Sequence, residues 1–201
     1  MSKITYPQYL ILVYTLSLSV GLVPQLGITQ PNSFVANTGT AVLVGFEAPH
    51  FTVSDMNGKT HSTNELVGKK NLLVTFFPKC FTFNCTNQIT SLRDVYAQLR
   101  ENDIEVWGVS TDEAEGIKGQ KAYAHHLKLP FLLIPDPSRK ICLLYGAVND
   151  RKQMAARMSI FIDKHGIVRW IDKQMYPPTH GKDVLTRLKN EGFIRPTKHE
   201  N

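Results

Sequence analysis

A cysteine stands at the start of an expected helix, directly after the turn that follows an apolar strand. The turn is Pro78-Lys-Cys-Phe-Thr-Phe-Asn-Cys85, and the strand before it covers residues 72–77. A thiol in the first turn of a helix faces the positive end of the helix dipole and its unpaired N–H groups, which favour thiolate over thiol. Thr82 can place a hydroxyl beside that sulfur, and Pro78 stiffens the turn and ends the strand. This pattern is typical of a nucleophilic cysteine, so Cys85 is the candidate nucleophile.

The segments around this turn predict a mixed α/β domain. Apolar residues recur at helical spacing after Cys85, at Ile89, Leu92, Tyr96 and Leu99. Strand and helix then alternate, and an antiparallel hairpin closes the sheet, which predicts a three-layer α/β arrangement with a mixed central sheet. Further strands are expected over 104–109, 131–134, 158–162 and 167–173, helices over 113–127, 138–145 and 182–190, and an N-terminal hairpin over 53–59.

The spacing Pro-x-x-x-Thr-x-x-Cys resembles the active-site motif of the peroxiredoxins, the alkyl hydroperoxide reductase and thiol-specific antioxidant family. Four other segments resemble that family in the same order along the chain: 45–51, 106–112, 132–147 and 157–166. The resemblance covers roughly residues 44 to 175 and is greatest to the bacterioferritin-comigratory Q-type or the one-cysteine E-type members. It implies a thioredoxin-like three-layer fold with a mixed central sheet and an N-terminal hairpin.

The resemblance implies an enzyme, a thiol-dependent peroxidase that reduces hydrogen peroxide or organic hydroperoxides. Cys85 would attack the peroxide and become a sulfenic acid, which an external thiol such as a thioredoxin-like protein would reduce. In this family Thr82 would hydrogen-bond the peroxide and Pro78 would shield the sulfenic acid. Arg157 would keep the cysteine ionised, and Gln88 would have a supporting role. No metal site and no other cofactor are implied, and a homodimer is a further expectation.

The other two cysteines bear on how the sulfenic acid is resolved. Q-type members often carry a resolving cysteine five residues after the nucleophile, a position that Thr90 occupies here. Cys80 is the candidate internal partner, because it lies in the loop just before Cys85. Cys142 stands in an apolar helix and is expected to be packed in the core. A one-cysteine mechanism with an external thiol and a mechanism resolved by Cys80 both remain open from the sequence.

Two other functions are alternatives. The first is a thioredoxin-type thiol–disulfide oxidoreductase, which is disfavoured because Thr82 stands where such a protein needs the first cysteine of a Cys-x-x-Cys pair. The second is a non-catalytic thioredoxin-fold module tethered to a membrane. It is disfavoured because a decayed site need not keep Pro78, Thr82, Cys85 and Arg157 together.

The overall composition is that of an ordinary globular protein, with 42% hydrophobic and 20% charged residues. The formal net charge is +6, but basic residues are scattered among acidic ones, so nucleic acid is not an expected partner.

The N-terminal part of the chain differs from the rest. Lys3 is the only charged residue before Glu47, and residues 9–23 form an apolar run that ends at Pro24. The run suits a signal peptide better than a full membrane span, which needs about 20 apolar residues. The expected division is a signal peptide or membrane anchor over 1–26, a linker over 27–43, the peroxiredoxin domain over 44–192 and a C-terminal tail over 193–201.

This leader predicts a protein of the cell envelope, either exported or anchored in the membrane through residues 9–26. The alternative is a cytoplasmic protein whose start codon is wrongly assigned.

Overall fold

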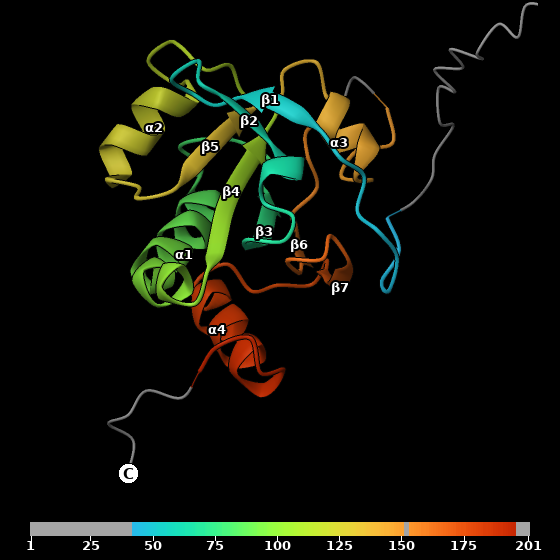
Figure 1. The fold of residues 1–201 in the computed structure, drawn as a ribbon. Helices are drawn as coiled ribbons and strands as arrows, with labels where there is room; N and C mark the ends of the chain where they lie inside the picture. The colour runs from blue at the N-terminus through green and yellow to red at the C-terminus, as the bar shows by residue number, and fades with distance from the viewer. Residues whose placement is uncertain (1–41, 151–152, 196–201) are drawn as a thin grey trace, which may run out of the picture. The chain divides into compact units, whose positions relative to one another are not determined.

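The computed structural model describes residues 42–150 and 153–195, so the expected leader and most of the expected linker lie outside the described residues. The described part contains a five-stranded mixed sheet with helices on both faces and a separate two-stranded hairpin (Figure 1). The predicted three-layer α/β arrangement is therefore confirmed.

The sheet has the order β5-β4-β3-β6-β7. Its strands are β3 (Asn71–Phe76), β4 (Ile104–Ser110), β5 (Leu132–Pro135), β6 (Met158–Ile162) and β7 (Val168–Asp172). The hairpin consists of β1 (Thr52–Ser54) and β2 (Thr60–Ser62), followed by a short 3-10 helix over Thr63–Glu65. The helices are α1 (Phe83–Glu101), α2 (Gln120–Leu127), α3 (Lys140–Leu144) and α4 (His180–Asn190).

Strand β3 is the centre of the sheet and positions the site. It runs parallel to β4 and antiparallel to β6, and every one of its residues is buried. Burial on both faces explains why the sequence of this strand is an almost unbroken apolar run. The antiparallel register places Phe76 opposite Met158. The end of β3 and the start of β6 therefore meet, and this brings Arg157 to the turn that leads into Cys85.

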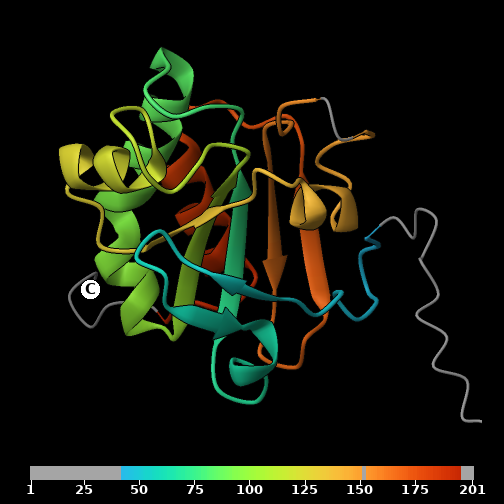
Figure 2. The same ribbon diagram turned by 90° about the horizontal axis from the view of Figure 1, so that it is seen from above.

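The two faces of the sheet are covered by different elements (Figure 2). Helices α1, α2 and α4 pack on one face, where Leu73 and Phe77 belong to the same buried cluster as apolar residues of all three helices. Helix α3 and the segment around the hairpin pack on the opposite face against Val74 and Trp107. The helix that carries Cys85 lies against α4.

Some boundaries differ from those expected. The predicted helix over 113–127 begins only at Gln120, because Gly116 has φ +97°, which does not occur within a right-handed helix. The last helix begins at His180 rather than at residue 182. The core also extends beyond residue 192, since Ile194 is buried and Phe193 packs against the same cluster.

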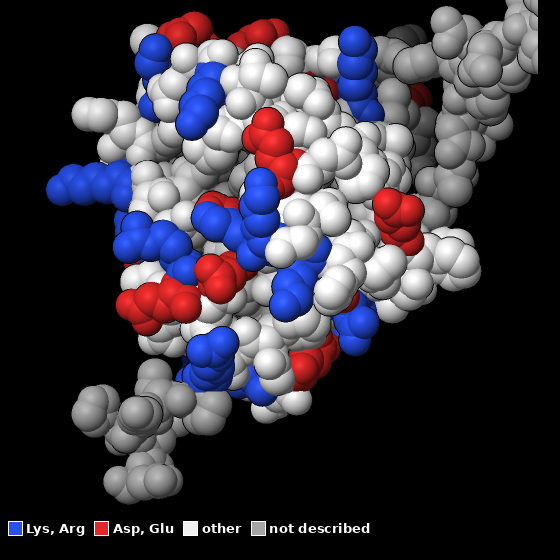
Figure 3. Space-filling model, in the orientation of Figure 1, with Lys and Arg blue, Asp and Glu red and all other residues white. Residues whose placement is uncertain are grey.

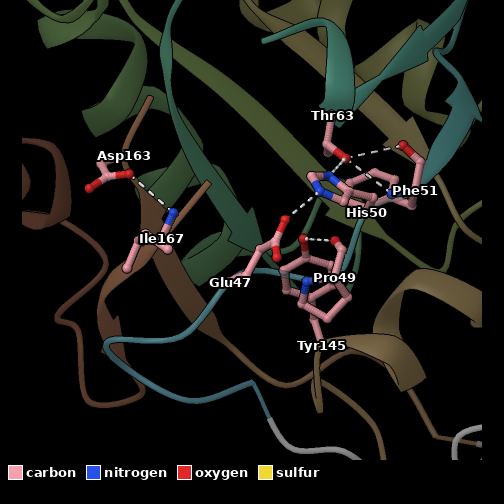
Figure 4. A network of polar contacts seen from close by, with 8 residues as sticks. All are labelled: Glu47, Pro49, His50, Phe51, Thr63, Tyr145, Asp163 and Ile167. Atoms are coloured by element: carbon pink, nitrogen blue, oxygen red, sulfur yellow. Dashed lines mark hydrogen bonds and ion pairs between the residues drawn. The ribbon is translucent and has the colours of Figure 1, made fainter. Parts of the chain in front are cut away.

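Polar contacts hold the segment that precedes the hairpin, as Figure 4 shows. The Tyr145 hydroxyl donates to the Pro49 carbonyl at 2.7 Å, and the Phe51 amide donates to Thr63 Oγ1 at 3.1 Å. Thr63 Oγ1 also lies 3.3 Å from Nδ1 of His50. These bonds join the segment to α3 and to the end of β2, so they have a structural role in fixing the hairpin on the sheet.

The charged side chains do not gather by sign on the face drawn in Figure 3, where basic and acidic residues are interspersed. Among the described residues, several charged side chains form ion pairs, including Lys70 with Glu105 and Arg187 with Glu191. On this face the net positive charge of the chain is therefore not concentrated in one patch.

Candidate active site

Cys85 lies in the first turn of α1, as the third residue of the helix, and its side chain is only 1% exposed. Thr82 is the N-cap residue with an extended backbone, and its carbonyl accepts a hydrogen bond from the Thr86 amide at 2.9 Å. The first N–H groups of a helix have no acceptor within the helix, and this turn contains no acidic residue. The sulfur therefore sits in the positive field at the start of α1.

Arg157 reaches this sulfur from the residue that precedes β6. Its Nη2 atom lies 3.5 Å from Cys85 Sγ. Its Nη1 atom donates to the Asn84 carbonyl at 3.4 Å and to Oε1 of Gln88. The guanidinium group is half-buried, so it is partly shielded from water and fixed by three contacts to one helical turn. A cation held in this way stabilises negative charge on the sulfur and on an oxygen that reacts with it.

Gln88 connects the arginine to the central strand. Its side chain is fully buried, and its Nε2 group donates to Thr75 Oγ1 at 2.8 Å and to the Phe76 carbonyl at 3.2 Å. Because a carbonyl only accepts, the amide nitrogen must face Phe76 and the amide oxygen must face Arg157. The residue expected to have a supporting role is thus a direct partner of the arginine.

Replacing Gln88 by leucine is expected to loosen the arginine and destabilise the protein. The change leaves the Phe76 carbonyl and the Thr75 hydroxyl without this donor in a buried place, which costs about 1 to 3 kcal/mol. We expect a lower free energy of unfolding in urea and a lower rate of reaction with peroxide. Gln98→Leu, at an exposed position of the same helix, is the matched control. Equal effects of the two changes would contradict the role given to Gln88.

Thr82 and Pro78 shape the turn beneath the sulfur. The Thr82 hydroxyl donates to the Lys79 carbonyl at 3.0 Å, so its proton closes the turn, while its oxygen can still accept a hydrogen bond. Pro78 is half-buried directly after the buried Phe77. Phe81, between the two, has φ +59°, a left-handed conformation that is uncommon for a bulky residue. Its ring packs against Tyr123, which helps to hold this backbone in place.

The other two cysteines each lie beside a carboxylate that outweighs any neighbouring cation. The backbone amide of Cys80 donates to Asp112 Oδ2 at 2.8 Å, and burial together with this carboxylate raises the pKa of the Cys80 thiol far above its usual range. Burial and Asp136 raise the pKa of the Cys142 thiol in the same way. Both thiols are therefore protonated at neutral pH, and neither is a ready nucleophile.

Two residues of the site are missing from the sequence-based set. Ser159 Oγ donates to Thr75 Oγ1 at 2.8 Å, and the two residues face each other across the β3–β6 pair. They extend the contacts of Gln88 into the sheet. The signal that could reveal them is a hydroxyl residue within each of two mainly apolar strands, since buried polar groups need partners.

The chain is similar to known proteins over most of its described length. The profile of the AhpC/TSA family matches residues 44–171. The chain is 33% identical over 165 residues to a chloroplastic peroxiredoxin Q of Triticum aestivum, and the matched region covers 80% of this chain and 74% of the relative. It is 30% identical over 154 residues to a putative peroxiredoxin bcp of Coxiella burnetii, covering 74% and 99% of the two chains.

Solved structures show the same fold. A mutant of PrxQ from Xylella fastidiosa superposes with a TM-score of 0.69 at 17% identity, over 77% of this chain and 99% of that one. Peroxidoxin BcpB from Mycobacterium tuberculosis gives a TM-score of 0.67 at 19% identity over the same shares. The expected thioredoxin-like fold is confirmed.

The expected location at the cell envelope is wrong. The relatives are named as chloroplastic peroxiredoxin Q or as bacterial bcp, and none of these names indicates export. Within residues 42–150 and 153–195, no helix is both long and apolar enough to cross a membrane. The expected anchor over residues 9–26 lies outside the described residues, and membrane association has no support.

The matches to the family profile and to named peroxiredoxins agree with the buried cysteine and its arginine partner. Neither the thioredoxin-type oxidoreductase nor the non-catalytic module is favoured. The chain belongs to the AhpC/TSA family of peroxiredoxins and is a thiol-dependent peroxidase.

Proposed function

We propose that Cys85 is the nucleophile of this peroxidase and that it works as a one-cysteine enzyme reduced by an external thiol. The observation that carries the proposal is the 3.5 Å contact between Arg157 Nη2 and the buried Cys85 Sγ in the first turn of α1. Cys80 and Cys142 are instead kept protonated by burial and by neighbouring carboxylates.

In the oxidation step, the Cys85 thiolate attacks one oxygen of the peroxide. A sulfur–oxygen bond forms, the O–O bond breaks, and the second oxygen leaves as hydroxide or alkoxide, which takes a proton from water. The sulfur is oxidised to a sulfenic acid and the peroxide is reduced to water or an alcohol. Arg157 stabilises the charge that passes from the sulfur to the leaving oxygen, because its guanidinium already lies beside the sulfur.

Thr82 would orient the peroxide for this attack. Its hydroxyl proton is given to the Lys79 carbonyl, so its oxygen is positioned to accept the proton of a peroxide O–H group. Pro78 would limit the access of water to the sulfenic acid. Phe81 and Phe83, on either side of Thr82, are exposed aromatic residues that an alkyl group could contact. We therefore propose that organic hydroperoxides as well as hydrogen peroxide are substrates.

The reduction step needs two equivalents of thiol. A first external thiol loses its proton and attacks the sulfenic sulfur as a thiolate, which forms a mixed disulfide and releases hydroxide, and the hydroxide takes up that proton to become water. A second thiol then returns Cys85 to its reduced form as the external disulfide leaves. A thioredoxin-like protein or a small thiol would supply these electrons. The expected homodimer stays a prediction.

The fate of Cys80 tests the one-cysteine cycle. When wild-type protein receives one equivalent of peroxide without reductant, we expect no disulfide between Cys80 and Cys85 in its non-reduced mass spectrum. The reason is that Cys80 is buried beside Asp112 and its thiol stays protonated. Cys80→Ser should consume peroxide as fast as wild type when an external thiol is present.

The contrary result is equally clear. A Cys80–Cys85 disulfide in wild type, together with a sulfenic acid that persists only in Cys80→Ser, would make Cys80 the resolving cysteine. The variant Cys142→Ser serves as the control for loss of a buried thiol that also lies beside a carboxylate.

A further inference from the structure

His180 is a buried ionisable residue that the proposed mechanism does not use. It is the first residue of α4, and its side chain is fully buried. Its Nε2 atom lies 2.9 Å from Ser159 Oγ. Its Nδ1 atom has no hydrogen-bond partner among the residues that the structure describes. A buried histidine needs an explanation, because burial of a polar ring is unfavourable unless hydrogen bonds compensate for the loss of water.

A continuous chain of hydrogen bonds leads from His180 to the arginine of the site. Ser159 Oγ donates to Thr75 Oγ1 at 2.8 Å, and Thr75 Oγ1 also accepts from Gln88 Nε2 at 2.8 Å. Gln88 Oε1 in turn accepts from Arg157, whose Nη2 contacts Cys85 Sγ. The four side chains between α4 and the guanidinium share one property, complete burial: His180, Ser159, Thr75 and Gln88.

The directions of these bonds define the state of the ring. A hydroxyl has one proton, and with that of Ser159 directed to Thr75, His180 carries its proton on Nε2 and donates it to Ser159. Burial lowers the pKa of His180 to about 4. The positive charge of Arg157 also lowers this pKa, whereas the negative charges of Asp172 and Asp183 oppose the shift. The ring is therefore neutral at neutral pH and acts as a fixed donor at the end of the chain.

A second contact fixes where α4 begins. The Gly181 amide donates to Ser91 Oγ at 3.0 Å, on the helix that carries Gln88 and Cys85. A Cβ atom at position 181 would lie 1.9 Å from the Ser91 carbonyl oxygen, so only glycine allows this approach. The backbone next to His180 is thus held directly against α1, which fixes the ring relative to the site.

We propose that His180 is a positioning residue of the peroxidase, which holds the Arg157 guanidinium beside Cys85 through Ser159, Thr75 and Gln88. The proposal rests on the proposed roles of Cys85 and Arg157. With the histidine donor in place, Ser159 gives its proton to Thr75, and Thr75 presents only lone pairs to the Gln88 amide. Without it, the two hydroxyl groups can exchange their donor and acceptor roles, and the Gln88 amide loses its fixed partner.

The test compares His180→Leu with His180→Gln. Leucine removes the donor, whereas the glutamine amide can donate to Ser159 in place of Nε2. We expect His180→Leu to lower the second-order rate of Cys85 oxidation by about tenfold at pH 7, since small misplacements of a catalytic group have effects of this size or larger. The pH profile of this rate should also differ from that of wild type. His180→Gln should restore most of the rate and the wild-type profile.

Controls separate positioning from stability. Val184→Ala removes a buried apolar contact on the same helix, so it should lower the free energy of unfolding without changing the rate or its pH profile. Ser159→Ala breaks the same chain from β6 and should reproduce the slower reaction and the altered profile. If His180→Leu does not fold, Ser159→Ala tests the positioning role in its place.

The role of His180 would be overturned if folded His180→Leu, or Ser159→Ala, reacted at the wild-type rate and with the wild-type pH profile. This conclusion holds when wild type reacts with peroxide and Cys85→Ser does not. If wild type does not react with peroxide, the proposed function fails and this proposal fails with it.

Discussion

Cys85→Ser is expected to abolish the reaction with peroxide. A serine hydroxyl is not ionised at neutral pH and cannot form a sulfenic acid, so only the uncatalysed reaction should remain. Removal of the serine nucleophile of a protease costs on the order of 10⁶ in rate, and a loss approaching that size is expected here. The measurement is peroxide consumption under excess thiol, with wild type and variant compared at equal concentration.

The matched controls for this change are Cys80→Ser and Cys142→Ser. Both replace a buried thiol by the same side chain, but neither thiol contacts Arg157 in the structure as Cys85 does. Their rates should stay near that of wild type. Activity that survives in Cys85→Ser and disappears in one of the other two variants would show that the nucleophile has been misassigned.

The second large effect is expected at Arg157. Replacing it by leucine removes the guanidinium that lies 3.5 Å from the sulfur, and loss of one such charge-stabilising donor costs about 10²- to 10³-fold in rate. The pH profile of the reaction should also change, because the guanidinium is the charged group beside the sulfur. Stopped-flow measurements of Cys85 oxidation across pH give both quantities.

Arg157→Lys should recover only part of the loss. A lysine ammonium keeps the charge, but it lacks the planar fork that contacts the sulfur and the Gln88 oxygen at the same time. Arg169→Leu is the control for net charge, since it removes a half-exposed arginine on β7 that pairs with Asp163 at 3.6 Å. An equal loss of rate in Arg169→Leu would point to the overall charge of the protein instead of the Arg157 contact.

The central part of the fold could be predicted because its signals are local. The apolar run at 72–77 predicts a buried strand, and the structure has β3 at Asn71–Phe76. The helical spacing after Cys85 predicts α1, whose buried residues include the apolar ones on which the prediction was based. The start of α2 was not predictable in the same way, because the left-handed backbone at Gly116 is a property of the folded loop and not of the apolar pattern.

The candidate site was likewise predictable only where its residues are close in the sequence. Cys85, Thr82 and Pro78 lie within one short segment, so their neighbourhood follows from the sequence, although the bond from the Thr82 hydroxyl to the Lys79 carbonyl does not. The contact of Arg157 with Cys85 crosses 72 residues and was expected only because of the family resemblance.

No sequence pattern joins His180 to Ser159. Their contact depends on how closely α4 packs on α1, and that distance is set by Gly181 against Ser91. A contact that depends on helix packing in this way can be identified only from the three-dimensional structure.

The most direct test of the role of Cys85 is to identify the sulfur atom that peroxide oxidises. Wild-type protein would receive one equivalent of hydrogen peroxide in the presence of a reagent that traps sulfenic acids, and its peptides would then be analysed by mass spectrometry. We expect a trapped adduct on the peptide that carries Cys85, and none on Cys80 or Cys142, whose thiols are kept protonated by burial and by their carboxylate neighbours. An adduct on either of these two, with Cys85 unmodified, would contradict this role.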